Sequence, residues 1–195
     1  MALAYPERTW TYEDLLALPD EGKRYEIIEG ELFEMTGPNG KHVWTVVNLN
    51  ELLLPYVKAM GGNVVLPIAE VFMRGADPVQ PDLFAILPGG QARLSTRGFE
   101  GPPDLVVEVL SPSNRSHDTR LKRNVYGRAG VREYWIVDPE ARTVEVLALH
   151  RDELHRTGLF FGETRIASPL LPEAAFTAAD VFAGLDDIIP APDEP

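Results

Sequence analysis

The 195-residue sequence contains no cysteine, which excludes disulfide bonds and thiolate metal sites. This absence fits a reducing compartment, so we expect a cytoplasmic protein. No apolar run reaches the roughly 18 residues that a membrane span needs, and no membrane partner is expected. The opening residues, MALAYPERTWTYEDLL, lack the basic stretch and apolar core of a signal peptide, so no export segment is predicted there.

Basic residues are also scarce, with 18 Lys and Arg against 30 Asp and Glu, a formal net charge of −12. A surface of this charge repels nucleic acid on average. The charge is uneven, however, because residues 111–132 carry six basic side chains and one acidic one. The six are Arg115, Arg120, Lys122, Arg123, Arg128 and Arg132. This cationic segment directly follows an apolar strand that contains a carboxylate, and the two features together suggest a site for an anionic ligand.

Turn signals and hydrophobic spacing predict an α/β (α+β) domain built around one mixed sheet. Helices are expected at 11–18, 43–57, after 114 and at 176–185, with Pro55 as a kink or end. A hairpin is expected at 25–35 and a second one at 131–150, around the turn DPEA. Further strands are expected at 63–73, 81–87 and 104–110, with a loop at 89–103. We expect a single domain over 1–195, with its core at about 10–182 and a flexible tail at 186–195.

Glu108 lies in the middle of the apolar strand DLVVEVL, where a carboxylate is unexpected. Side-chain alternation places Glu108 on one face of its strand and Asp82 on one face of the strand PDLFAIL. If these strands pair with both carboxylates on the same side, the two repel and one pKa rises. A hard divalent cation removes that penalty, and Mg²⁺ typically uses one or two carboxylates plus waters. Lys122 on the next helix could then lie beside the site and assist the chemistry.

A simpler interpretation of the same residues stays open at this point. Glu108 could lie at a strand edge, where it reaches solvent or pairs with a neighbouring arginine. Lys122 could equally be one more solvated cation of a basic helix. The pattern alone does not decide between these interpretations and a shared metal site.

Several segments together resemble the Uma-two family of restriction-endonuclease-like proteins, in the PD-(D/E)XK nuclease superfamily. They are YEIIEGELFEM, the histidine after GPNGK, QPDLFAIL, PPDLVVEVLSPSN, LKRNVYGRAGVREYWIVDP and VEVL, and they span about 10–182. The resemblance implies a restriction-endonuclease-like fold, in which a mixed central sheet flanked by helices follows an N-terminal helix and hairpin. It maps the aspartate of the motif to Asp82 and the acidic residue to Glu108, with the Val109 carbonyl as a third metal ligand. The motif lysine is absent at Leu110 and is replaced, in this interpretation, by Lys122 on the following helix.

Four further residues are weaker candidates for the site. His42 matches a family position and could bind phosphate or transfer a proton, although capping of its helix is the favoured interpretation. Glu29 and Glu34 could supply another carboxylate but fit better as solvated hairpin residues. Tyr126, one turn after Lys122, could hold the lysine in position.

The sequence therefore predicts a metal-dependent DNA endonuclease that uses Mg²⁺ or Mn²⁺. Asp82, Glu108 and Lys122 are the expected catalytic residues, and Arg115, Arg120 and Arg123 the expected contacts to DNA. A homodimer is expected, because cutting two strands needs two sites. The alternative is a binding or regulatory module that keeps the nuclease fold without cutting.

Overall fold

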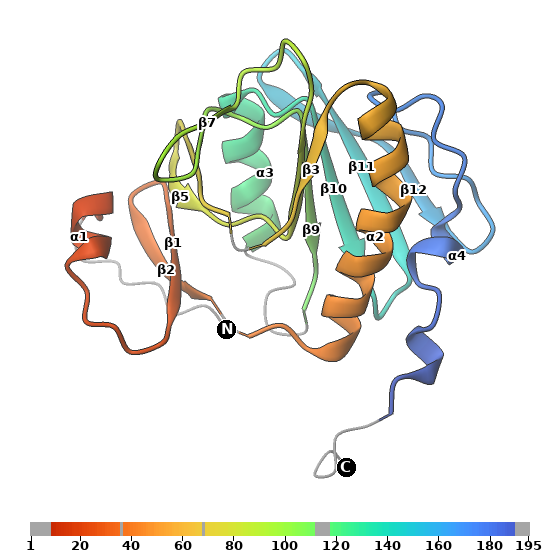
Figure 1. Ribbon diagram of the computed structural model, residues 1–195, viewed down its shortest axis with the longest axis horizontal. Helices are drawn as coiled ribbons and strands as arrows, with labels where there is room; N and C mark the ends of the chain where they lie inside the picture. The colour runs from red at the N-terminus through yellow and green to blue at the C-terminus, as the bar shows by residue number, and fades with distance from the viewer. Residues whose placement is uncertain (1–8, 36, 68, 112–117, 190–195) are drawn as a thin grey trace.

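The computed structural model describes residues 9–35, 37–67, 69–111 and 118–189. Within these ranges the strands form two six-stranded mixed sheets (Figure 1). The first sheet has the order β2-β1-β5-β4-β8-β7. Its strands are β1 (Arg24–Ile28), β2 (Glu31–Met35), β4 (Val71–Met73), β5 (Ala76–Val79), β7 (Arg93–Leu94) and β8 (Phe99–Glu100).

The second sheet has the order β12-β11-β10-β9-β6-β3 and carries the larger core. Its strands are β3 (Asn63–Val65), β6 (Leu83–Ile86), β9 (Leu105–Val109), β10 (Glu133–Asp138), β11 (Thr143–His150) and β12 (Glu153–Phe161). β9 and β10 pair in parallel, whereas β6 pairs antiparallel with β9 on its other side. The helical elements are α1 (Tyr12–Leu16), α2 (Gly40–Ala59), α3 (Asp118–Ala129), α4 (Ala178–Val181) and the 3-10 turn η1 (Leu185–Asp187).

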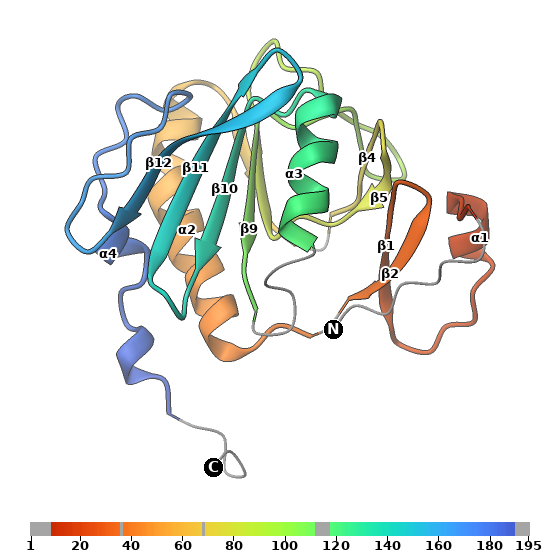
Figure 2. The same ribbon diagram turned by 180° about the vertical axis from the view of Figure 1, so that it is seen from behind.

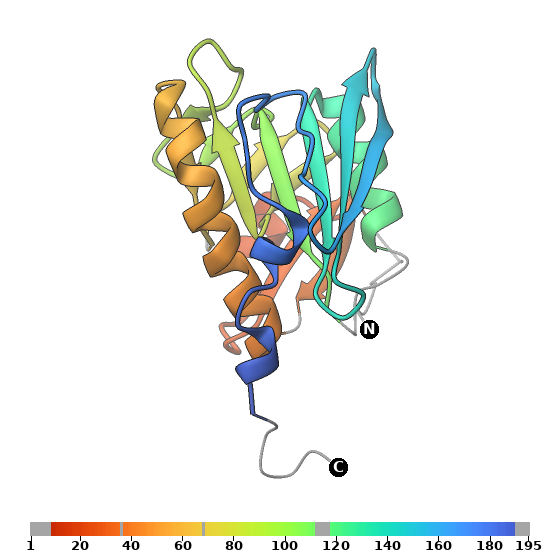
Figure 3. The same ribbon diagram turned by 90° about the vertical axis from the view of Figure 1, so that its right-hand side faces the viewer.

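Helices cover both faces of the second sheet, with α2 in front in Figure 1 and α3 in front in Figure 2. Figure 3 shows the sheet edge-on between them, with α4 beside α2. Alternation along β9 divides its side chains between two cores. Leu105 and Val107 belong to the core that contains Leu53 of α2, and Val106 belongs to the core that contains Val125 of α3. Because both faces are covered, β9 is buried along its whole length.

The N-terminal hairpin packs as part of the first sheet, and this sheet shares the α3 core with the second one. Ile28 of β1 lies in the same cluster as Val106 and Val125. Burying such a side chain stabilises the fold by about 1.5–3 kcal/mol relative to leaving it exposed. The first sheet, the second sheet and α3 are therefore held together by one apolar cluster, and this arrangement brings β1 close to β9.

Several sequence predictions are confirmed at the level of single elements. The helix expected at 11–18 is α1, which Thr11 caps in a capping box with Asp14. The turn around DPEA joins β10 and β11 as an antiparallel hairpin. The helix expected after residue 114 is α3, which packs Val125 into the core with Leu121 and Ala129 beside it.

Other details differ from the prediction. The expected single sheet is two sheets, and the expected strand at 63–73 is two strands, β3 and β4, in different sheets. The segment between the strands expected at 63–73 and 81–87 contains β5, and the expected loop at 89–103 contains β7 and β8. Pro55 does not end α2, which continues to Ala59.

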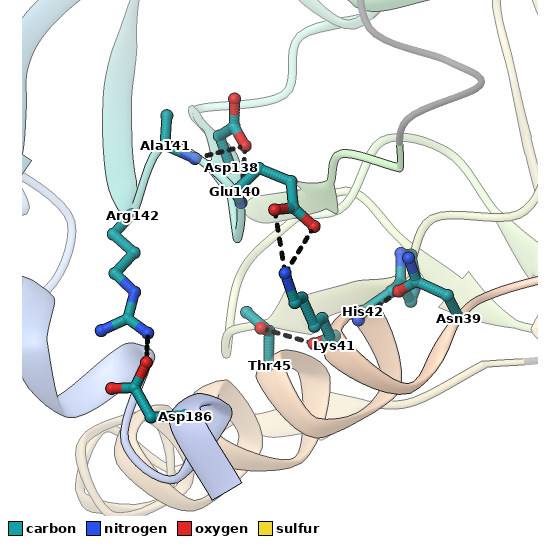
Figure 4. A network of polar contacts seen from close by, with 9 residues as sticks. All are labelled: Asn39, Lys41, His42, Thr45, Asp138, Glu140, Ala141, Arg142 and Asp186. Atoms are coloured by element: carbon teal, nitrogen blue, oxygen red, sulfur yellow. Dashed lines mark hydrogen bonds and ion pairs between the residues drawn. The ribbon is translucent and has the colours of Figure 1, made fainter. Parts of the chain in front are cut away.

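The sequence also predicted a flexible C-terminal tail and no membrane span. Of the predicted tail, residues 190–195 lie outside the described ranges, whereas Asp186 belongs to η1 and pairs with Arg142 (Figure 4). Among the described residues, no helix has the length and apolar character needed to cross a membrane.

Candidate active site

A cavity of about 550 Å³ opens where β9 ends and β6 begins. We call it the site cavity. Among the described residues, its lining comes from the ends of these two strands, from the N-terminal half of α2, from the segment Leu66–Pro67, from α3, and from single residues of β1, β2 and β10. Asp82, Glu108 and Lys122 all line it, so the structure brings together the three residues that the sequence singled out.

Asp82 stands immediately before β6, beside Glu108 on the neighbouring strand. Leu83 pairs with Val107 in the antiparallel register, so Asp82 and Glu108 occupy the next positions along the two strands. Such cross-strand neighbours project from the same face of a sheet. The Asp82 carboxylate accepts a hydrogen bond from the Val109 N–H at 2.8 Å through Oδ2. Its other oxygen, Oδ1, lies 3.0 Å from Nε2 of His42.

Glu108 is joined to α3 by two contacts through the same oxygen. Nζ of Lys122 lies 3.2 Å from Glu108 Oε1, and the Tyr126 hydroxyl donates to that oxygen at 2.6 Å. Lys122 is only 2% exposed, so it is not a solvated helix cation. Burial, followed by the negative charge of Glu108, raises the pKa of Tyr126 well above its ordinary value, so the hydroxyl stays protonated and remains a donor.

Glu26 is a fourth residue of this cluster, and the sequence analysis missed it. This carboxylate of β1 is 1% exposed and lies 2.9 Å from Nζ of Lys122 through Oε2. Its Oε1 accepts the main-chain N–H of Gln80 at 2.7 Å. Lys122 therefore bridges a carboxylate of the first sheet and one of the second.

The signal for Glu26 was present in the sequence. In YEII, as in VVEV, a carboxylate interrupts an apolar run that lacks simple alternation. Such a run is typical of a strand that is buried on both faces. The candidates weighed for an additional carboxylate were instead Glu29 and Glu34 of the same hairpin.

The start of α2 positions His42 next to Asp82. Asn39, not His42, caps the helix, because its side chain accepts the main-chain N–H of His42 at 2.9 Å (Figure 4). Lys41 forms an ion pair with Glu140 of the β10–β11 turn at 2.9 Å. The favoured interpretation of His42 as a capping residue is therefore wrong, and its ring faces the site.

The sequence and the fold of this chain both resemble those of known proteins. The model of the Uma2 family, described as "Putative restriction endonuclease", matches residues 12–179. The chain belongs to this family. The matched span agrees with the expected 10–182.

A solved structure with a fold similar to that of this Uma2 protein is described as a putative nuclease belonging to DUF820 from Anabaena variabilis. It is 22% identical, covers 89% of this chain and 98% of its own, and has a TM-score of 0.71. At this identity the likeness establishes the fold alone. A search of curated proteins gives no match.

Two of the three arginines predicted to contact DNA, Arg120 and Arg123, can be placed relative to the site of this Uma2 protein. Arg115 lies outside the described residues. Arg120 is exposed, and the Arg123 guanidinium donates to the Leu154 carbonyl at 2.9 and 2.6 Å, so it is used to attach α3 to β12. Neither Arg120 nor Arg123 lines the site cavity, whereas Arg24 of β1 does.

The two accessory glutamates of the hairpin also lie elsewhere. Glu29 pairs with Arg128 at 2.8 Å, and Glu34 pairs with Lys23 at 3.2 Å. Neither lines the site cavity. The additional carboxylate of the site comes from the same hairpin, but it is Glu26.

Charge at the site is unbalanced. Within the cluster of Glu26, Asp82, Glu108 and Lys122, three carboxylates face one ammonium group, so the four charges sum to −3 + 1 = −2. Among the described residues, no three His, Cys, Asp or Glu side chains converge as a ready metal cluster. Mg²⁺ does not require such a cluster, because it retains several waters and uses one or two carboxylates. The oxygens of Asp82, Glu108 and the Val109 carbonyl therefore suit a hard divalent ion in both chemistry and charge.

Proposed function

We propose that the protein is a metal-dependent endonuclease that hydrolyses phosphodiester bonds of DNA. Membership of the Uma2 family supports a nuclease acting on nucleic acid. The observation that carries the proposal is the convergence of Asp82, Glu108 and Lys122 in one cavity. A homodimer with two such sites is part of the proposal, because both strands of a duplex must be cut.

Asp82, Glu108 and the Val109 carbonyl are the proposed ligands of Mg²⁺ or Mn²⁺, as restriction-endonuclease-like proteins generally use divalent ions. When bound, such an ion supplies Lewis-acid activation of the phosphate and of water. Two protein contacts, the Val109 N–H and His42, fix the Asp82 carboxylate on the cavity wall. Tyr126 and Lys122 do the same for Glu108.

Lys122 acts in this proposal as a fixed positive charge. As the cation of two ion pairs, with Glu26 and Glu108, it has no free lone pair with which to take a proton. It can neutralise the charge that develops on the phosphate as the bond breaks. Glu26 positions the ammonium group and does not itself contact the substrate.

A second candidate function is a nuclease-fold binding or regulatory module that does not cut. It is favoured by the fact that Asp82 and Glu108 each already have protein donors in the structure. Such a module does not need to retain affinity for a divalent ion. Metal binding therefore separates the two candidates better than cleavage of one arbitrary substrate.

The test combines calorimetric titration of Mg²⁺ and Mn²⁺ with cleavage of plasmid and oligonucleotide DNA. We expect the parent protein to bind the ion and to cut only in its presence. Asp82→Asn and Glu108→Gln should lose both properties, whereas Glu34→Gln, a matched change outside the cavity, should keep both. A parent protein that gives no binding heat would overturn the metal-dependent nuclease and leave the binding module.

A further inference from the structure

Part of the site cavity has walls that a DNA backbone cannot use. Three apolar side chains with large exposed fractions line it, namely Val43 at 47%, Val47 at 39% and Leu66 at 43%. Val46 and Pro67 complete this apolar wall. It lies in the same cavity as Asp82, Glu108 and Lys122, so a substrate held at the carboxylates is next to it.

A phosphodiester is a strongly hydrated anion, and its burial against an apolar wall without hydrogen bonds is costly. In a fully paired duplex the apolar faces of the bases are stacked, and only phosphates, sugars and groove edges are accessible. An unpaired base exposes a flat face that apolar side chains can cover. The apolar wall therefore matches the flat face of a base, which is covered in a paired and stacked duplex.

Polar atoms inside the cavity match the edge of a base. Oε1 of Gln80 and Nδ1 of His42 are buried and have no hydrogen-bond partner within the described part of the chain. Both residues line the cavity. Nε2 of His42 is taken up by Asp82 at 3.0 Å, so Nδ1 is the ring nitrogen left for a ligand. Two buried polar atoms without partners call for a ligand that forms hydrogen bonds, as the edge of an unpaired base does.

We propose that the site cavity receives an unpaired nucleobase, so that the substrate is DNA with a single-stranded or extruded base at the scissile position. This inference rests on the proposed nuclease function and specifies its substrate class. The base lies against Val43, Val47 and Leu66, and the adjoining phosphate lies at Asp82 and Glu108. Arg24 and Lys122, which line the same cavity, supply the positive charge for the backbone.

The volume of the site cavity also suits a bound nucleobase. Sites for small molecules usually measure about 300–1,000 Å³, with largely apolar walls and a few placed polar groups. The site cavity, at about 550 Å³, falls within this range and has that composition.

The test uses oligonucleotides that carry the fluorescent base 2-aminopurine, whose emission is quenched by stacking between neighbouring bases. Three probes share one sequence: a single strand, a duplex with 2-aminopurine paired, and a duplex with it unpaired. Binding is followed by anisotropy and base emission with Ca²⁺ as the divalent ion, and cleavage is followed separately with Mg²⁺. We expect the single strand and the unpaired duplex to bind at least about tenfold more tightly than the paired duplex, with rising emission.

The matched variants are Val43→Ser/Val47→Ser, which removes part of the apolar wall, and Leu94→Ser, which removes an exposed apolar side chain outside the cavity. All three positions are well exposed, so the fold should tolerate each change. The double variant should lose the preference for unpaired DNA and the emission change, and Leu94→Ser should keep both. Equal binding of all probes by the parent, or an unaltered preference in the double variant, would overturn the base pocket.

The outcomes also separate this inference from the nuclease itself. Binding with raised emission but no cleavage in Mg²⁺ supports the base pocket and contradicts the nuclease. Cleavage of paired duplex without raised emission contradicts the base pocket and leaves the nuclease standing. Failure to bind any probe contradicts both.

Discussion

At the scale of single residues, Lys122 holds the site together. Its ammonium group lies between two buried carboxylates, Glu26 and Glu108, that come from different sheets. Breaking a buried ion pair by removing one partner leaves an uncompensated charge, which is more costly than never having had the pair. The residue with the clearest proposed role in chemistry therefore also supports the fold.

We predict that Lys122→Ala lowers the free energy of unfolding by about 3–5 kcal/mol at neutral pH, in addition to abolishing any turnover. The reason is the burial of the Lys122 ammonium group between two carboxylates. Urea denaturation measures the effect. Arg120→Ala, on the same helix but exposed, serves as the control and should change stability by less than about 0.5 kcal/mol.

A partner substitution makes this prediction sharper. In Glu26→Gln/Lys122→Met the charge left behind by the lysine is reduced, so the double variant should be more stable than Lys122→Ala. If both variants were as stable as the parent, the ion pairs would contribute nothing to the fold.

Tyr126 predicts a dependence of stability on alkaline pH. Burial is the main cause of its raised pKa, so the folded protein keeps the hydroxyl neutral while the unfolded chain ionises near the ordinary value of 10.0. The stability that Tyr126 contributes is thus complete below pH 10 and declines as pH rises through that value.

Tyr126→Phe removes this hydroxyl and one donor to Glu108, and it should cost about 1–3 kcal/mol near pH 8. The difference in unfolding free energy between variant and parent should shrink at about pH 10.5. Urea titrations at the two pH values give both differences. A difference in unfolding free energy that stays constant or grows at the higher pH would contradict a raised pKa of Tyr126 in the folded protein.

At the scale of elements, the strands that are buried on both faces were the easiest to predict from the sequence. β9 and β6 were recognised because their apolar runs are continuous, and alternation then placed Asp82 and Glu108 side by side. The helix expected after residue 114 is likewise present as α3, where Leu121, Val125 and Ala129 follow helical spacing and face the core. These signals are local, and the structure follows them.

The remaining elements could not be predicted because tertiary contacts decide them. The apolar run of β1 indicates burial, but nothing near β1 in the sequence indicates that α3 will cover it or that Lys122 will be the partner of Glu26. Pro67 divides the run from Asn63 to Met73, and the two halves pair in different sheets. The arginines of the basic segment were assigned to DNA by charge alone, whereas geometry commits Arg123 to the Leu154 carbonyl.

At the scale of the whole molecule, the net charge of −12 opposes binding to a polyanion. Among the residues that the structure describes, Arg24 and Lys122 are the two that bring positive side chains into the site cavity. Few phosphates are therefore neutralised on binding, and few counterions are released.

We predict a shallow dependence of DNA affinity on salt, in contrast to a protein that uses the whole basic segment. With two phosphate contacts, the slope of log affinity against log salt should be about −1.8 for duplex and about −1.4 for single strands. Anisotropy titrations between about 50 and 200 mM NaCl measure it at constant divalent ion. Arg24→Ala should make the slope shallower by the amount of one phosphate contact, which is about 0.9 for duplex and about 0.7 for single strands. Arg120→Ala should leave the slope unchanged. A slope beyond about −4 would show that α3 contacts the backbone.

The order of the site residues along the chain has a consequence for synthesis. A ribosome that has made residues up to Val109 has produced all three carboxylates, Glu26, Asp82 and Glu108, but not the ammonium group that lies between two of them. Glu26 and Lys122 are 96 residues apart, so their contact closes only after α3 has left the ribosome and both sheets have met. The nascent chain is therefore held in a state without a finished site until late in translation. A truncated chain that ends before Asp118 should have neither the fold nor the chemistry of the complete one.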